Sequence, residues 1–227
     1  MEVLVLVLLI ALVVAIAAAS YRLKLKRRRE LVTMARQLGL EYSREDLHGC
    51  VSLPFALLQR GDGRGTENVL AGVWQDTPLL EFDYWYYVES TDSNGNTSRS
   101  TYRFSCAAAE VDAGLSPLTL GRENVLTRLA DSIGLSDIRF ELEDFNRAFT
   151  VKCKDRKFAN DFVDQRMMGW LLQADGGFSF EACGRWLLVY SKRRRPSDLI
   201  PLIGTLKQYR DHVPRVVYDL YGLRASG

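Results

Sequence analysis

The stretch LLEFDYWYYVE, Leu79–Glu89, carries the clearest strand pattern of this chain. One face of an extended backbone would carry only apolar and aromatic side chains, those of Leu80, Phe82, Tyr84, Tyr86 and Val88. The opposite face begins with the acids Glu81 and Asp83 and continues with Trp85 and Tyr87. Alternation with a period of two residues is typical of a β-strand, because successive side chains point to opposite faces. The stretch therefore predicts a long strand with two chemically different faces.

A second strand follows and completes a hairpin. The polar stretch Ser90–Ser100 contains Asn94-Gly95, a pair that favours a tight turn between two strands. Thr101–Val111 then returns as the partner strand, and Asn68–Trp74 precedes the ribbon as a further strand. These segments predict an antiparallel sheet built around one long ribbon.

Helical patterns lie on both sides of this ribbon in the sequence. Apolar residues recur at helical spacing within residues 31–38, and again in four later segments. These segments are Arg122–Ile133, Phe158–Gln173, Leu199–Leu206 and a last helix that starts at Pro214. A tight hairpin around Gly184 is expected from Phe178–Cys183 and Trp186–Ser191. The predicted fold class is therefore α+β, with antiparallel hairpins packed against helices.

Two short patterns occur twice. Gly39-Leu40 follows a helix, as Gly134-Leu135 does, and Leu57-Leu58-Gln59 is repeated as Leu171-Leu172-Gln173. Residues 53–59 are accordingly expected as a short helix. Two loosely similar halves and a chance likeness both stay open at this point.

The N-terminus carries VLVLVLLIALVVAIAAA, Val3–Ala19, an unbroken apolar run. As a helix it would be roughly 26 Å long, and adding Ser20 and Tyr21 gives roughly 28 Å. A bilayer core is about 30 Å thick, so the run predicts one transmembrane helix at the short end of the usual range. A cleaved signal peptide is the rival interpretation, because Ala17–Ser20 would suit cleavage. Its positive charge would have to precede the apolar run, where Glu2 is the only charged side chain.

The positive charge follows the apolar run instead. It consists of the membrane-flanking residues Arg22, Lys24, Lys26, Arg27, Arg28 and Arg29. Because flanks rich in Lys and Arg stay in the cytoplasm, we expect the N-terminus outside and the C-terminal domain inside. The chain then divides into an anchor, residues 1–29, and a cytoplasmic domain, residues 30–227. The expected location is the cell membrane, with residues 3–21 in the bilayer.

The rest of the chain has an ordinary globular composition. Of 227 residues, 47% are hydrophobic and 26% charged, which excludes a wholly disordered or collagen-like chain. Removing the six flanking cations and Glu2 leaves 24 basic against 27 acidic residues, so the body is mildly acidic. That balance argues against a general nucleic-acid binder. The four cysteines are scattered without a CxxC pair, which favours buried thiols over a disulfide framework.

Residues suited to catalysis are sparse. The chain has two histidines, and His48 with Cys50 offers two ligands where a closed zinc site needs four. There is no GxSxG motif for a serine nucleophile. The glycine-rich stretch Gly61–Gly65 lacks the GK[ST] end of a phosphate loop and is expected to be a surface loop.

The acids of the central strand are a further candidate. Glu81 and Asp83 would share one strand face, and paired carboxyl groups can act as general acid and base when they are buried together. We expect them instead to face solvent, with Arg99 and Arg103 opposite on the partner strand.

A basic cluster follows the last predicted strand. It consists of Lys192, Arg193, Arg194 and Arg195. Four cations in a row could contact lipid phosphates, and a tethered body already lies near anionic lipid. No aromatic stacking platform accompanies them, so no nucleic acid is expected as a partner. The cluster is either a docking point on the inner leaflet or a solvated strand end.

Short motifs give the sequence a family resemblance. The motifs are Phe82-Asp83-Tyr84, Phe145-Asn146-Arg147-x-Phe149-x-Val151 and Arg166-Met167-Met168. With the anchor, they resemble an uncharacterised family of bacterial single-span membrane proteins that carry a domain of unknown function. The likeness covers most of residues 30–195 and implies a bacterial membrane protein. Its motifs are typical of packing, and it carries over no active site.

These features predict a membrane-tethered, non-enzymatic interaction or scaffold domain on the cytoplasmic face of the membrane. Its partners would be the lipid bilayer and another protein, with no cofactor and no metal ion. The alternative is a membrane-tethered, hydrolase-like enzyme that uses scattered carboxylates or Cys and His residues. A deep pocket together with a strongly perturbed Asp83 or His48 would favour the enzyme, and a flat exposed apolar patch would favour the interaction domain.

Overall fold

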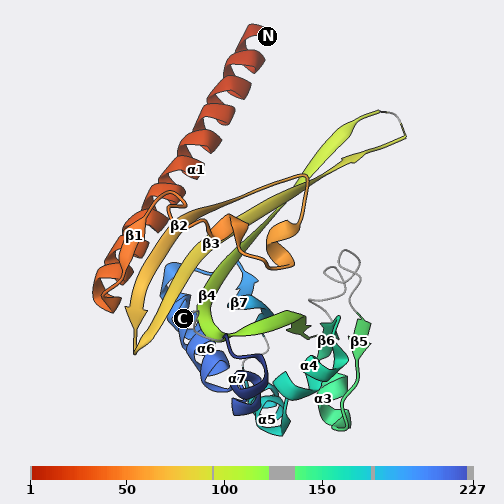
Figure 1. The fold of residues 1–227 in the computed structure, drawn as a ribbon. Coiled ribbons are helices and arrows are strands. Elements are labelled where there is room, and N and C mark those ends of the chain that lie inside the picture. The colour runs from red at the N-terminus through yellow and green to blue at the C-terminus, as the bar shows by residue number, and fades with distance from the viewer. Residues whose placement is uncertain (1, 94, 123–135, 175–176, 224–227) are drawn as a thin grey trace.

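The structure is a computed structural model that describes residues 2–93, 95–122, 136–174 and 177–223. It has an α+β fold with one antiparallel sheet, as the sequence predicts (Figure 1). The strands are β1 (Glu41–Ser43), β2 (Gly63–Trp74), β3 (Thr77–Thr91), β4 (Thr97–Gly121), β5 (Ser136–Ile138), β6 (Thr150–Cys153) and β7 (Ser179–Lys192). The helices are α1 (Glu2–Leu38), α3 (Glu143–Ala148), α4 (Arg156–Phe162), α5 (Gln165–Gln173), α6 (Ile200–Asp211) and α7 (Arg215–Tyr221). Short 3-10 turns are η1 (Cys50–Ser52), η2 (Leu57–Gln59) and η4 (Pro196–Asp198).

The long strand β4 organises the sheet. Neighbouring strands follow the order β1-β2-β3-β4-β6-β5, and β7 pairs with β4 outside this path. Ala108 of β4 pairs with Leu80 of β3 and also with Leu188 of β7. Further along β4, Leu118 pairs with both β6 and β7. β3 and β6 therefore share one edge of β4, and β7 occupies the other.

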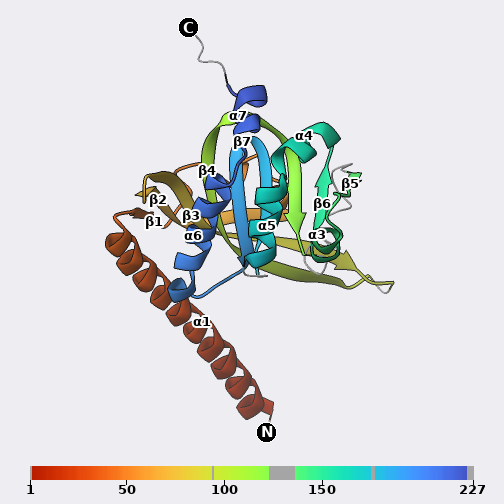
Figure 2. The same ribbon diagram turned by 90° about the horizontal axis from the view of Figure 1, so that it is seen from below.

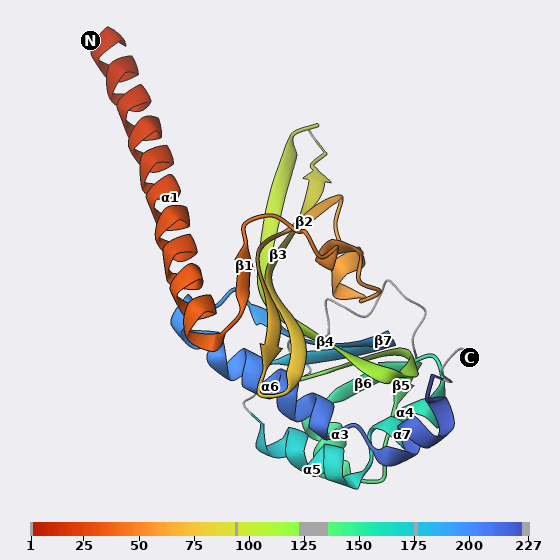
Figure 3. The same cartoon turned by 60° about the vertical axis from the view of Figure 1, so that its left-hand side comes forward.

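The predicted ribbon is confirmed and is longer than expected. β3 and β4 pair continuously from Leu80 to Thr91 on the β3 side. The ladder between β3 and β2 ends at Tyr87, and the ladder between β4 and β7 ends at Phe104. The end of the ribbon therefore projects beyond the sheet. Figures 1 and 3 show that it points to the same side as the N-terminal end of α1.

Different layers cover the two faces of the sheet. On one face, Phe82 and Tyr84 form a core cluster with residues of the 50–58 segment and with Tyr190 of β7. On the other face, Leu79 belongs to a larger core that includes the end of α1 and the buried side of α6. Figure 2 shows α5 and α6 lying across the strands on this side.

α1 is one continuous helix from the apolar run into the body. None of its most apolar 18-residue stretch is buried, and this part stands away from the molecule (Figures 1 and 2). By length and composition it is a candidate membrane span, the one found among the described residues. Its last turns pack on the body through Leu31, Met34 and Ala35. The helix crosses the boundary expected at residue 29 without a break.

The prediction of a hairpin around Gly184 is wrong. β7 is a single strand that runs antiparallel along β4, with Trp186 opposite Glu110 and Gly184 opposite Leu115. Gly184 adopts φ +60° within the strand, and the register shifts on the β4 side at this point. A glycine in the left-handed conformation serves a bulge as well as a turn, and here it keeps both strands paired.

Other expected segments also differ from the structure. The helix expected over Phe158–Gln173 is two helices, because Asp164 starts α5 as its N-cap and accepts the N–H of Met167 at 2.8 Å. The helix expected over residues 53–59 is the short turn η2 with irregular chain before it, and β2 begins inside the loop expected at Gly61–Gly65.

The hypothesis of two halves gains no support. A second hairpin after Gln173 is absent from the described chain, since β7 is one strand. The predicted helix Arg122–Ile133 and the mark Gly134-Leu135 lie outside the described residues, apart from Arg122 itself.

Candidate functional site at the base of the anchor helix

Arg27 lies on the buried stripe of α1. Helical spacing places it one turn before Leu31 and on the same side as Met34, so it faces the body. Its Nε and Nη2 atoms donate to the two carboxylate oxygens of Asp83 at 2.8 and 2.5 Å. Its Nη1 atom donates to the carbonyl oxygen of Arg194 at 2.6 Å. One side chain thus joins α1 to β3 and to the segment after β7.

Asp83 receives further donors from two other segments. Asn68 Nδ2 donates to Asp83 Oδ2 at 2.9 Å, and Arg193 Nη2 donates to the same oxygen at 3.2 Å. The Arg27 side chain is 11% exposed and the Asp83 side chain 5%, so the pair is largely removed from water. Buried charges are tolerated only when partners replace the lost hydration. Asp83 is therefore a hub that four segments of the chain share.

A bulge in β2 supplies the amide of this hub. The β2–β3 register shifts between Glu67 and Leu70, and Asn68 there has φ 57°. Asparagine adopts the left-handed conformation more readily than most residues, because its short side chain bonds locally. Its Oδ1 accepts from the hydroxyl of Tyr42 at 2.8 Å. Glu67 lies 4.0 Å from both Arg28 and Arg193, at the rim of the hub.

The solvent-facing orientation expected for Glu81 and Asp83 is wrong. They share a strand face as predicted, but they are only 1% and 3% exposed. Asp83 lies opposite Ser105, and Arg99 and Arg103 pair with positions further out on the ribbon. The reason is that α1 covers this face, so the partner of Asp83 comes from the helix and not from β4.

Glu81 is the second buried acid on this face. In the part of the chain that the structure describes, neither of its carboxylate oxygens has a hydrogen-bond partner. Burial raises the pKa of Glu81 well above its usual range, the charge of Asp83 raises it further, and Arg27 opposes the shift. Glu81 therefore keeps its proton to higher pH than an exposed glutamate.

The basic cluster after β7 does not act as a unit. Arg193 turns inward to the acidic hub, and the guanidinium of Arg194 lies 4.3 Å from the ring centre of Phe178. Lys192 and Arg195 are exposed. Two of the four cations proposed for lipid contact thus take part in packing of the body, and two face solvent.

The membrane-flanking cations divide in the same way. Arg27 and Arg28 are half-buried against the body, where Arg28 lies near Glu67. The other four cations of the flank are exposed, namely Arg22, Lys24, Lys26 and Arg29. The contact of Arg27 with the carbonyl of Arg194 brings the two predicted basic segments side by side, although they are far apart in the sequence.

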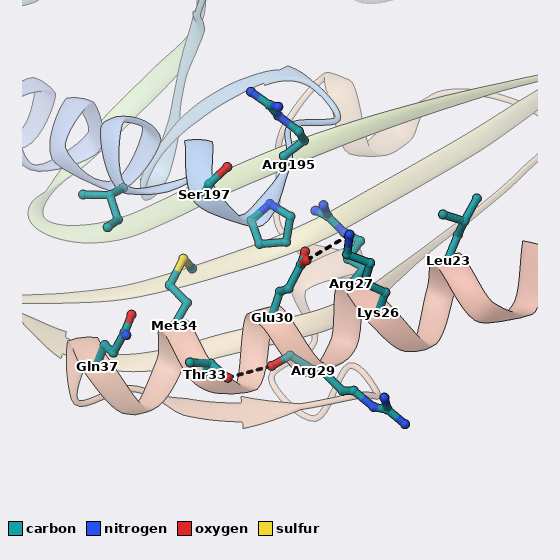
Figure 4. Close-up of a pocket in the computed structure, with 12 residues that line it drawn as sticks. Leu23, Lys26, Arg27, Arg29, Glu30, Thr33, Met34, Gln37, Arg195 and Ser197 are labelled. Atoms are coloured by element: carbon teal, nitrogen blue, oxygen red, sulfur yellow. Dashed lines mark hydrogen bonds and ion pairs between the residues drawn. The ribbon is translucent and has the colours of Figure 1, made fainter.

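A groove of about 780 Å³ opens between α1 and the segment that leads into α6 (Figure 4). Lys26 and Met34 lie on the α1 wall, and Figure 4 shows Arg29 and Arg195 at opposite rims with their guanidinium groups directed outward. Ile200 adds an apolar side chain from the start of α6. The groove therefore combines an apolar lining with cations at its edges.

The catalytic candidates of the sequence do not assemble into a site. His48 is exposed, while Cys50 is fully buried and burial raises the pKa of its thiol. Among the described residues, no group of three or more His, Cys, Asp and Glu side chains is placed to hold a metal ion. The buried acid Glu181 accepts the N–H groups of Ala56 and Leu57 at 2.6 and 3.1 Å, and burial raises its pKa to about 7.

In the motifs that carry the family resemblance, the aromatic and methionine side chains pack in the core, whereas Asp83 forms the ionic hub. The rings of Phe145 and Phe149 stack with centres 5.2 Å apart. The side chain of Asn146 donates to the carbonyl of Phe140 at 2.7 Å and accepts its N–H at 2.9 Å. Met167 and Met168 are both buried.

Sequence reasoning missed the link between Arg27 and Asp83. A signal was present, because Arg27 falls on the same helical stripe as Leu31 and Met34, which are buried. One arginine on an apolar stripe requires a buried acid as its partner, and the central strand holds two acids among aromatic residues.

Comparisons with known proteins agree with this fold. No protein-family model and no curated protein matches the sequence. Among solved structures, the chain is similar to the mycobacterial trehalose monomycolate transport factor A, TtfA, with a TM-score of 0.59. The match covers 82% of this chain and 93% of that chain at 14% sequence identity. The likeness shows a shared α+β fold.

Proposed function

We propose that this chain is a membrane-tethered, non-enzymatic interaction domain whose body lies on the cytoplasmic face of the membrane. The observation that carries the proposal is the buried pair of Arg27 and Asp83. It locks the end of a candidate membrane span to the central sheet, so the body faces the bilayer in one orientation. A domain that needs only to stay near a membrane can hang from a flexible linker. A fixed orientation suits a surface that must meet a partner in the same membrane.

The charges that flank the apolar run support a body on the cytoplasmic side of the membrane. The four exposed cations of the flank follow the apolar run, and the residue before it, Glu2, is acidic. Cations next to a span favour the cytoplasmic leaflet, where anionic lipids hold them.

The projecting ribbon is the surface we propose for the partner. In the described chain, no strand pairs with the outer edge of β4 between Thr97 and Tyr102. Such an edge presents free N–H and C=O groups, and an added strand from another protein can satisfy them. The ribbon points to the same side as the apolar end of α1, so it can reach a protein held in the bilayer (Figures 1 and 3).

The structural neighbour suggests a context for this contact. That neighbour is a transport factor, and we propose by analogy that this chain is an accessory factor of a membrane transport system. The analogy concerns the kind of role and does not include the identity of the transported molecule.

Two measurements test the proposal. A C-terminal reporter active only in the cytoplasm should be active, and a reporter active only outside should be silent; the opposite pattern would place the body on the wrong side. A photo-crosslinking residue at Ser100 on the ribbon should capture a discrete membrane protein. The same residue at Glu143 on α3 is the matched control. Equal capture from both positions, or none from Ser100, would remove the ribbon as the contact surface.

A further inference from the structure

With residues 3–21 in the bilayer, the end of the groove nearest Leu23 lies at the level of the lipid headgroups. Leu23 and Lys26 are two and five residues past Tyr21, which places them roughly 3 and 7.5 Å further along the helix axis. The headgroup layer of one leaflet is about 5 to 8 Å thick. The end of the groove nearest the membrane therefore opens at the level of the lipid phosphates. This holds whether the body is on the cytoplasmic or the outer side of the membrane.

Three of the four cations that line the groove, Lys26, Arg29 and Arg195, are not committed to buried partners, whereas the fourth, Arg27, is held by Asp83. Lys26 lies 3.9 Å from Glu30, and their side chains are 74% and 44% exposed. Arg195 pairs with Asp198 at 2.9 Å and is 83% exposed. Exposed pairs of this kind contribute little free energy, so a phosphate can displace them at small cost. Arg29 makes no ion pair with any described residue. The groove thus carries positive charge that an anionic group can use.

The uncharged lining of the groove suits the parts of a lipid headgroup other than its phosphate. Pro196 and Ile200 face Met34 across the groove and form its apolar part. Ser197 and Gln37 add polar groups to the lining. A volume of about 780 Å³ is ample for a phosphate with a small hydroxylated group and the glycerol that joins it to the acyl chains.

We infer that this groove binds the headgroup of one anionic phospholipid, with the phosphate at Lys26 and Arg195. This inference rests on the proposed function only in requiring that α1 span the bilayer. It needs neither the protein partner nor the cytoplasmic orientation. The bound lipid would brace α1 against the start of α6, next to the contact of Arg27 with Arg194.

The test uses the full chain in nanodiscs of phosphatidylcholine with phosphatidylglycerol. After mild delipidation, native mass spectrometry counts the lipid that each protein retains. The wild type should retain one phosphatidylglycerol in preference to phosphatidylcholine. Lys26→Ala with Arg195→Ala should weaken this retention about 30-fold, because each cation near an anionic lipid contributes roughly fivefold. Ser197→Trp, which fills the groove without changing its charge, should also abolish retention.

The matched control removes two cations of the same helix outside the groove, Arg22→Ala with Lys24→Ala. It should keep the retained lipid within twofold of the wild type. An equal loss in this control would show general surface attraction and overturn the site. Equal retention of phosphatidylcholine by the wild type, or release of the lipid by millimolar inorganic phosphate, would also overturn the inference. Resistance of all variants to alkaline extraction from membranes reports separately on whether α1 spans the bilayer.

Discussion

Replacing Arg27 by alanine should destabilise the body far more than replacing an arginine that forms a similar pair at the surface. Arg27→Ala removes both hydrogen bonds to Asp83 and the bond to the carbonyl of Arg194. Breaking a buried ion pair by removing one partner costs about 3 to 5 kcal/mol, because the remaining charge stays desolvated. Asp83 keeps Asn68 and Arg193, so we expect the lower end of this range, about 3 kcal/mol.

Urea unfolding of the full chain in detergent measures this change. All four tryptophans lie in the body, so their fluorescence reports its unfolding. The matched control is Arg99→Ala on the ribbon, because Arg99 pairs with Glu89 at 2.6 Å while their side chains are 56% and 43% exposed. This control should shift the urea midpoint far less than Arg27→Ala does, because exposed ion pairs contribute little to stability. If the two variants lose equal stability, the Arg27 pair does not hold α1 to the sheet.

Three further predictions follow from the same region and from the core. Glu81→Gln should gain stability relative to the wild type as pH rises. Folding raises the pKa of Glu81. The stability that this group contributes is therefore present below the ordinary glutamate pKa and is lost as pH rises toward the pKa of Glu81 in the folded protein. Urea midpoints between pH 5 and pH 8.5 check this, and parallel curves for the two proteins would contradict it. Asn68→Ala should cost about 1 to 3 kcal/mol in the same assay, since it strains a positive φ and removes a donor from buried Asp83, whereas a loss below that range would show that the bulge tolerates alanine. A maleimide should react with half-buried Cys183 in the native protein and with the other cysteines only on unfolding, and early labelling at Cys50 would refute the burial of that thiol.

The sequence predicts the central ribbon well, for a simple physical reason. Alternation over Leu79–Glu89 is a local property, so both the strand and the shared face of Glu81 and Asp83 can be inferred from it. What covers that face is not local. The covering element is α1, and a membrane anchor with a basic flank gives no sign by composition that two of its cations face inward.

The errors elsewhere have one non-local and one local origin. A glycine in an apolar run is consistent with a turn or a bulge, and Gly184 stays inside one strand, opposite the bulged part of β4, because β4 offers a long edge to pair with. Asp164 looks like an ordinary helical residue in the pattern, yet its side chain caps a new helix. For Gly184 the deciding partner is a distant strand, whereas for Asp164 it is the N–H of Met167, which is near in sequence but leaves no mark in an apolar pattern.

We expect the anchor and the body to move as one rigid unit. Spin labels at Ala18 in the apolar part of α1 and at Glu143 in α3, with Cys183 replaced by serine, report their separation in nanodiscs by pulsed dipolar spectroscopy. A rigid connection gives one narrow distance distribution that is the same at low and high lipid content. A broad distribution, of the kind given by domains on a flexible linker, would contradict it.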